Sequence, residues 1–235
     1  MCDEAKKRTQ DFRCDKTLLL SSMKYFEKYL SDQSTLDDID ISVHCDISIF
    51  DWLMQYVHSL KPAMEIKTAI SILISSDFLQ MAGLVEESLD YVAANLQEIL
   101  LLPIDMNCMN SALVKRLAGK VEIDVLDGLK DKKDKLQSKI FMKKLEILFQ
   151  DNQNMLQRCA HCSALFTQSQ RRWQICEKGQ IFIDAHGELQ APHVADKGFE
   201  LNKFVLSLRA KKIPWRDLFW KLFACVIEFH CIECD

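Results

Sequence analysis

Two cysteine pairs near the end of the chain constrain its fold more than any other feature. They are Cys159-Ala-His-Cys162 and Cys231-Ile-Glu-Cys234, and 68 residues separate them. A spacing of two residues lets one tight turn present both sulfurs to a single metal ion, and four thiolates are ligands that tetrahedral Zn²⁺ prefers. The spacing therefore predicts one structural Zn²⁺ ion that ties the ends of a whole subdomain together.

Other side chains near the pairs offer alternative ligands. His161 and His230 each adjoin a pair and could replace one sulfur, and Cys176 is a fifth candidate. We favour the four cysteines because they complete the tetrahedron by themselves, and we interpret Cys176 as a small core residue in a strand. Four buried free thiols are the alternative to a metal site. Arg158 precedes the first pair, where its charge is expected to favour the thiolate form.

The composition favours a helix-rich chain. Its 235 residues are 49% hydrophobic, which is enough for one large domain or two smaller ones. Only 6 glycines and 4 prolines occur, which disfavours an all-β sandwich. The net charge of -4, with both signs interspersed, gives no general attraction to nucleic acid or to an anionic membrane.

The cysteine content indicates a reducing compartment. The chain has 10 cysteines, but the polar start, Met1–Arg8, is not followed by the apolar region of a signal peptide. The apolar stretch Leu218–Phe229 is too short to span a bilayer. We expect an intracellular protein, nuclear or cytoplasmic or both, in which paired cysteines usually bind metal.

Helical periodicity dominates the first hundred residues. Asp15 or Thr17 is the expected cap of the first helix, whose core stripe includes Met23, and Asp46 is the expected cap of the second. Alternating apolar residues predict a short strand over 39–43. The predicted helices cover about 17–30, 46–61, 66–74 and 85–96.

Further helices and a change of pattern follow Pro103. We expect a helix around 113–117 and an amphipathic one within 129–150, with Asp131–Lys135 on its solvated face. The periodicity lapses at 151–154. Beyond this point we expect strands at 173–176 and 181–184, a helix over about 198–208, and a last apolar helix that leads from Pro214 to Cys231.

The first 150 residues resemble a BTB (POZ) domain with its helical extension. Stretches such as IFDWLMQYV, ISILISSDFLQM and LVEESLDYV follow the order of BTB helices. Closer segments, and the two cysteine pairs, are similar to the SANT and BTB domain regulator of class switch recombination family. These segments are Cys2-Asp-Glu-Ala-Lys6, Met23-Lys-Tyr-Phe26, Asp40-Ile-Ser-Val-His-Cys-Asp46, Ile70-Ser-Ile-Leu-Ile-Ser-Ser76, Met106-Asn-Cys108 and Leu129-Lys-Asp-Lys-Lys-Asp-Lys135.

The resemblance implies an α+β fold in three segments. We expect a BTB domain of helical hairpins on a small sheet over 1–102, its helical extension over 103–150 and a zinc-clamped α+β subdomain over 151–235. The family's Myb-like SANT module and the apolar strand that precedes its BTB domain are expected to be missing. Functions that depend on the SANT module are therefore not carried over.

The resemblance also implies a non-catalytic homodimer. BTB domains mostly pair through their first helix, and Leu18, Tyr25 and Tyr29 lie off the core stripe of that helix, so we map the dimer interface to them. The alternative is that one chain covers both stripes. The implied role is negative regulation of transcription or of immunoglobulin class switch recombination, with histone deacetylase co-repressors as partners.

Two rival functions stay open. A cullin-type ubiquitin ligase adaptor would use the helices of 102–148 to contact the cullin. An enzyme that uses zinc or a reactive thiol is disfavoured, because the chain has none of the GxSxG, HExxH, P-loop or GxGxxG motifs. Arg171-Arg172-Trp173 is too short a basic cluster to predict nucleic-acid binding. We expect no membrane and no small-molecule substrate as partners.

Overall fold

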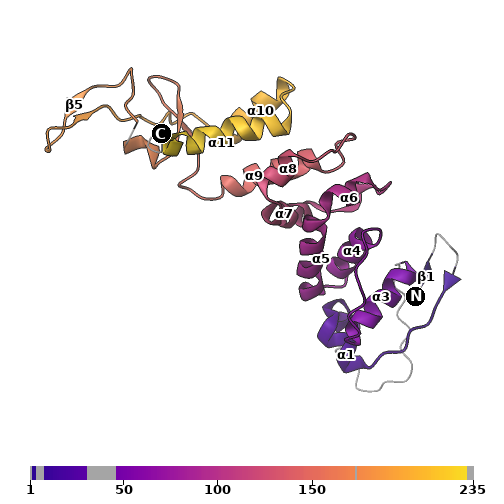
Figure 1. Ribbon diagram of the computed structural model, residues 1–235. Coiled ribbons are helices and arrows are strands. Elements are labelled where there is room, and N and C mark those ends of the chain that lie inside the picture. Colours follow the sequence, from indigo (N-terminus) through magenta and orange to yellow (C-terminus); the bar gives the residue numbers. More distant parts are fainter. Residues whose placement is uncertain (1, 4–7, 31–45, 173, 232–235) are drawn as a thin grey trace. The chain divides into compact units, whose positions relative to one another are not determined.

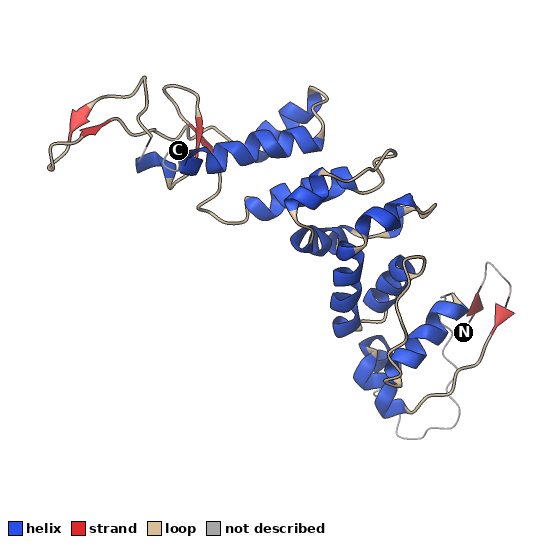
Figure 2. Ribbon diagram, viewed as in Figure 1, coloured by secondary structure: helices blue, strands red, loops and turns tan. Residues whose placement is uncertain are grey.

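The chain folds into two compact units, residues 1–110 and 111–235. The computed structural model describes residues 2–3, 8–30, 46–172 and 174–231 (Figure 1). Within this described part, helices dominate and the strands form two-stranded antiparallel sheets (Figure 2). The α+β class predicted from the sequence is confirmed.

The N-terminal unit is a set of short helices that follow one small hairpin. Strand β1 pairs with β2 in antiparallel register, and the strand predicted over 39–43 lies outside the described residues. The elements are β1 (Cys2–Asp3), β2 (Arg8–Thr9), α1 (Lys16–Ser22), η1 (Lys24–Phe26), α2 (Glu27–Leu30), α3 (Ile47–Val57), α4 (Ala69–Phe78), α5 (Ala82–Ala94), α6 (Leu96–Leu101) and η2 (Met106–Cys108).

The single helix predicted over 17–30 is instead broken at Met23. The cap is as expected, since the Leu18 N–H donates to Asp15 Oδ1 at 3.0 Å. Met23, however, has φ -126° and ψ 86°, outside the helical region. The Tyr25 N–H then donates to the carbonyl of Leu79 at 3.3 Å rather than to its own helix. A hydrogen bond to a distant segment has replaced one turn of local structure.

The core of this unit lies between α3 and the helices on either side of it. Asp46 caps α3 as predicted, because its carboxylate accepts from the N–H groups of Ser48 and Ile49. The core stripe predicted for the first helix consists of Leu19, Met23, Phe26 and Leu30. The last three are buried, and Leu19 is half-buried against the same core. The buried members include Met23, Phe26, Leu30, Leu53, Met54, Ile72, Leu79 and Leu84.

The C-terminal unit combines a helical core with a region of short strands. The helices α7 and α11 both pack against α9. The elements are α7 (Ser111–Lys120), α8 (Ile123–Asp127), α9 (Gln137–Leu148), β3 (Gln157–Arg158), β4 (Leu165–Phe166), η3 (Gln170–Arg172), β5 (Phe182–Ile183), β6 (Leu189–Gln190), α10 (Leu201–Ala210) and α11 (Trp215–Cys231).

The helical core of this unit joins segments that are far apart in the sequence. Phe141 of α9 is fully buried and meets Phe219 of α11, with ring centroids 5.5 Å apart. Arg216 binds both carboxylate oxygens of Asp127 at 2.6 and 2.7 Å, and Trp220 donates to the same carboxylate at 2.9 Å. Residues 111–150 of the expected extension and the C-terminal segment therefore lie in one compact unit, while the three-segment division stays a prediction.

Two details of the predicted elements in this unit are wrong. Asp131–Lys135 forms turns rather than a helix face, and α9 begins only at Gln137. Asp131 accepts the N–H groups of Leu136 and Gln137 at 2.8 and 3.1 Å, so its side chain holds the start of α9 instead of facing solvent along it. The described residues of 173–176 form no strand, whereas 181–184 contains β5, which pairs with β6.

The last helix buries part of its apolar face. Leu218, Phe219 and Leu222 of α11 are buried. Among the described helices, none has the length and hydropathy needed to cross a membrane.

Candidate metal centre and aromatic surface

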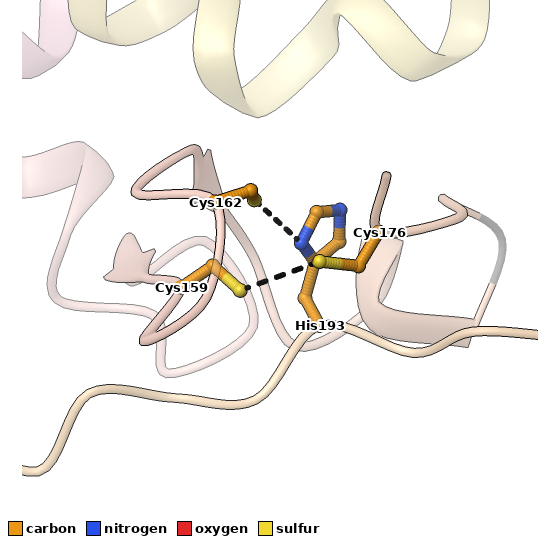
Figure 3. Close-up of side chains that lie close together, drawn as sticks. All are labelled: Cys159, Cys162, Cys176 and His193. Carbon is orange, nitrogen blue, oxygen red and sulfur yellow. Dashed lines mark hydrogen bonds between the residues drawn. The ribbon is translucent and has the colours of Figure 1, made fainter. Parts of the chain in front are cut away.

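The first cysteine pair occupies a tight turn between β3 and β4. The Cys159 N–H donates to the Ala164 carbonyl at 2.8 Å, and the Ser163 N–H donates back to the Cys159 carbonyl at 3.0 Å. Ser163 closes the turn with φ 64°, in the left-handed region. This turn places the sulfurs of Cys159 and Cys162 toward the same space (Figure 3). The sequence spacing predicted this local geometry.

A second turn presents Cys176. The Gly179 N–H donates to the Cys176 carbonyl at 3.0 Å, which bends the chain back at once. A Cβ at Gly179 would lie 3.1 Å from the Cys176 Cβ, so this close approach favours glycine. The Cys176 N–H donates to the Ala191 carbonyl at 2.7 Å and holds the cysteine beside the segment that carries His193.

Backbone pairing to β3 positions His193. The Ala160 N–H donates to the Val194 carbonyl, and the Asp196 N–H donates to the Arg158 carbonyl, both at 2.8 Å. The His193 ring stacks on Phe166, with centroids 5.1 Å apart. Backbone hydrogen bonds to Arg158 and Ala160, together with stacking on Phe166, thus hold His193 in place.

These four side chains form a cluster with the dimensions of a metal site. The sulfurs of Cys159 and Cys176 lie 3.7 Å apart, Cys162 Sγ lies 3.4 Å from His193 Nδ1, and all four donors lie within 4.8 Å of one another (Figure 3). Tetrahedral zinc with Zn–S bonds of about 2.3 Å separates two sulfurs by about 3.8 Å. A disulfide needs about 2.05 Å. The donors fit a metal ion.

The two thiols of the first turn differ in acidity. Burial raises the pKa of Cys159, but the N–H groups of Cys162, His161 and Val194, together with the His193 side chain, lower it to about 5. Burial and the neighbouring thiols raise the pKa of Cys162. The hydrogen bonds around the turn therefore favour the thiolate form of Cys159 over that of Cys162.

Arg158, expected to favour the thiolate, has a partner of its own. Its guanidinium forms an ion pair with Asp196, with 2.6 Å between Nη2 and Oδ2, and lies over the Phe199 ring. The hydrogen bonds of the turn are what lower the pKa of Cys159. Arg158 thus contributes by fixing the strand next to His193.

The cluster contains one of the two predicted cysteine pairs. Cys159 and Cys162 come together, but the side chain of Cys231 and all of Cys234 lie outside the described residues, as does the side chain of His230. His161 has an exposed side chain, and its N–H donates to Cys159 Sγ at 3.4 Å. The predicted four-cysteine ligand set stays untested.

From the sequence, Cys176 was named as a ligand candidate but interpreted as a core residue, and His193 was missed. Cys176 is buried, as expected of a core residue, but its sulfur faces Cys159. The glycine three positions later was the available signal, because Cys-x-x-Gly can make the same kind of turn as Cys-x-x-Cys. His193 follows Pro192 in an extended segment and had no local signal.

A buried glutamine connects this region to α11. Gln170 accepts the Thr167 N–H at 2.7 Å, and its amide nitrogen donates to the carbonyls of Cys225 and Val226 at 2.9 and 3.2 Å. The turn that follows β4 is thereby attached to the last helix.

The predicted interface residues of the N-terminal unit lie beside an exposed aromatic cluster. Tyr29 is 43% exposed and Phe78, from α4, is 52% exposed. The Tyr25 ring lies 4.7 Å from Phe78 and 5.5 Å from Tyr29, centroid to centroid. Leu18 is half-buried against the core, so its own chain already covers part of it. The periodicity of the first predicted helix did not indicate Phe78, because Phe78 belongs to α4.

A lysine lies over this aromatic cluster. The Lys28 ammonium is 4.5 Å from the Tyr25 ring centroid and 4.7 Å from that of Tyr29, at cation–π distance. The two hydroxyls lie 3.3 Å apart, and this hydrogen bond raises the pKa of Tyr25 and lowers that of Tyr29. We call Tyr25, Lys28, Tyr29 and Phe78 the aromatic surface.

Comparisons with known proteins agree with the N-terminal resemblance. Zinc finger and BTB domain-containing protein 34 of Homo sapiens is 30% identical over 78 residues, which cover 33% of this chain and only 15% of that protein. No solved structure matches the chain. The family model for the SANT and BTB domain regulator of CSR, BTB domain, matches residues 1–89. The predicted resemblance is confirmed, and residues 1–89 match the BTB domain of that regulator family.

Proposed function

We propose that the protein is a non-catalytic scaffold that associates with itself through its N-terminal unit and takes part in transcriptional regulation. The observation that carries this proposal is the match of residues 1–89 to a BTB domain. BTB domains generally self-associate and mediate protein contacts. A closed two-fold pair uses the same surface on both copies, so one patch is sufficient.

The aromatic surface supports this role. Tyrosine and phenylalanine are enriched at protein interfaces, and each can bury about 150–250 Å². A stable interface needs about 800 Å² from each partner, so the aromatic surface would form its centre and neighbouring residues its rim. Exposed aromatic rings gathered from two helices are costly to leave in water, and a second copy would cover them.

The solution mass tests self-association directly. Light scattering on the full chain should give about 54 kDa, twice the 27.2 kDa of one chain, at micromolar concentration. A particle of one chain mass across the whole concentration range would overturn the proposal.

The more specific role that we propose is negative regulation of gene expression and of immunoglobulin class switch recombination in the nucleus, by recruitment of histone deacetylase co-repressors. It is supported by the description of the matching family as a regulator of CSR. Affinity capture followed by mass spectrometry tests it, and co-repressor subunits are the expected result. A cullin in stoichiometric yield would instead favour a ubiquitin ligase adaptor.

In this scaffold the metal centre has a structural role, and we assign it one Zn²⁺ ion. Cys159, Cys162, Cys176 and His193 are the sulfur and nitrogen donors that zinc prefers. Four protein donors complete a tetrahedron and leave no position for water or substrate, which disfavours a zinc enzyme. Elemental analysis of reduced protein should give one zinc per chain, and its absence would refute the assignment.

A further inference from the structure

A polar cavity lies next to the candidate metal centre in sequence and in space. Its volume is about 370 Å³, and it is lined by Gln168, Arg171, Gln190 and Pro192. These residues come from the segment after β4, from η3 and from the end of β6. Its lining residues belong to neither the metal centre nor the aromatic surface.

Arg171 supplies the positive charge of the cavity and is held in place. Its Nε donates to the carbonyl of His193 at 3.2 Å. Within the described part of the chain, no acidic side chain is paired with its terminal nitrogens. A guanidinium fixed at Nε presents the planar fork that matches a carboxylate. The amide of Gln168 adds a neutral donor beside it, whereas the Gln190 amide already donates to Asp184 Oδ2 at 3.1 Å.

The β5–β6 hairpin provides apolar surface beside the cavity. Phe182 lies directly opposite Gln190 in the register, so the two side chains share a face of the hairpin. Phe182 is 52% exposed on this face, and Ile183 and Leu189, which lie opposite each other, are exposed on the other face. Among the described strands β5 pairs only with β6, which leaves an edge where an extended segment can add as a further strand.

The charges of the hairpin select between partners. Glu177, Asp184 and Glu188 outnumber Lys178 in the hairpin and its turns. A nucleic acid carries many phosphates, and each of them would be repelled by these carboxylates. An apolar segment with a single carboxylate meets far less of this repulsion, can place that carboxylate on Arg171, and can cover Phe182 with an apolar neighbour.

We propose that this cavity binds the carboxylate of one acidic residue in an extended, otherwise apolar segment of a protein partner. The carboxylate is held by the guanidinium of Arg171, and an apolar neighbour in the segment covers Phe182. This site goes beyond self-association through the N-terminal unit. It depends on the metal centre only because the carbonyl of His193 positions Arg171.

A pair of labelled peptides tests the proposal on the full chain. The probes are fluorescein-labelled Thr-Val-Glu-Val-Thr and the same peptide with Gln at its centre, titrated by fluorescence polarisation. We expect the Glu peptide to bind at least tenfold more tightly. Arg171→Gln should abolish this preference, whereas Lys178→Gln, which removes a nearby charge that does not line the cavity, should keep it. Phe182→Ser should weaken the binding of both peptides.

Zinc content is measured for every variant, so that loss of the metal centre is distinguished from loss of the peptide site. If Arg171→Gln loses zinc, Gln190→Glu decides, since it leaves Arg171 in place and should repel only the Glu peptide. Equal binding of the two peptides, no saturable binding, or a preference unchanged in both Arg171→Gln and Gln190→Glu would overturn the proposal. Tighter binding of single-stranded DNA through Arg171 would do the same.

Discussion

The two proposed sites are held in place by different forces. The aromatic surface lies on helices that bury a continuous apolar core, including Phe26, Leu53 and Leu79. Around the metal centre the buried cluster consists of Cys159, Phe166 and Cys176, and the strands are two residues long. Two-stranded hairpins are at best marginally stable by themselves. The first region is therefore stabilised by apolar burial, and we expect the second to be stabilised by the metal ion that its donor atoms bind.

Removal of the metal should separate the two regions most strongly. Structural zinc supplies an apparent free energy of about 10 kcal/mol or more to small domains. With a strong zinc chelator we expect fast hydrogen exchange over 157–196 and unchanged exchange over 46–101, measured by mass spectrometry. Equal protection of both regions before and after chelation would show that the strands need no metal.

Substitution of single donors tests which ligand set is used. Cys176→Ser and His193→Asn should reduce zinc from one ion per chain to a small fraction, because a tetrahedral site with three strong donors binds far more weakly. The matched control is the double variant Cys231→Ser with Cys234→Ser, which should keep its zinc. Loss of zinc in the double variant, with zinc kept in Cys176→Ser and His193→Asn, would instead support the four-cysteine ligand set predicted from the sequence.

A core substitution should act on the helical part without affecting the metal. Phe141→Ala leaves a cavity against Phe219 and should lower the free energy of unfolding by about 3–5 kcal/mol. Urea denaturation followed by circular dichroism measures this loss, and zinc stoichiometry should stay at one. Release of zinc in native buffer would mean that the helical core also maintains the metal centre.

Polar substitutions on the aromatic surface should weaken self-association. Tyr29→Ser combined with Phe78→Ser should raise the dimer dissociation constant at least tenfold, because both rings lose buried area at the interface. Sedimentation at several concentrations measures the change. Leu101→Ser is the control, since Leu101 is 73% exposed on α6, away from the aromatic surface in the sequence. Equal effects of the two changes on the dissociation constant would show that the interface lies elsewhere.

The smallest expected effect is the pH dependence of one ion pair. The hydrogen bonds from Arg216 and Trp220 lower the pKa of Asp127 to about 2. A carboxyl group with a lowered folded-state pKa contributes stability above its unfolded pKa of about 3.9, and this contribution is lost as the pH falls toward 2. Asp127→Asn should therefore lower the melting temperature slightly at pH 6, and the difference should shrink as the pH falls below 4.

Local patterns in the sequence were sufficient for most helices and for half of the metal centre. Apolar spacing and the caps Asp15 and Asp46 gave the positions of the early helices, and the spacing of Cys159 and Cys162 gave the first turn. These features depend on residues within one or two turns of each other. The fold class was implied by the resemblance of whole segments of the first 150 residues to a known family, and this resemblance is confirmed over residues 1–89.

The features that sequence reasoning missed all depend on distant partners. The break at Met23 follows from the hydrogen bond between Tyr25 and Leu79, and no local pattern contains that bond. His193 lies beside the cysteines because the segment after it is hydrogen-bonded to Arg158 and Ala160. Phe78 joins the tyrosines from another helix. Such long-range contacts have no fixed sequence spacing, so one sequence alone does not reveal them.

Cys176 and His193 stand at the two ends of the segment that contains the β5–β6 hairpin, and this position has an evolutionary consequence. With both ends fixed by the proposed zinc ion, the segment between them can lengthen, shorten or be replaced at little cost, since doubling a loop adds only about 0.6 kcal/mol of closure entropy. The hairpin can therefore be exchanged as a unit. Related chains could change what they recognise there while every metal donor stays where it is.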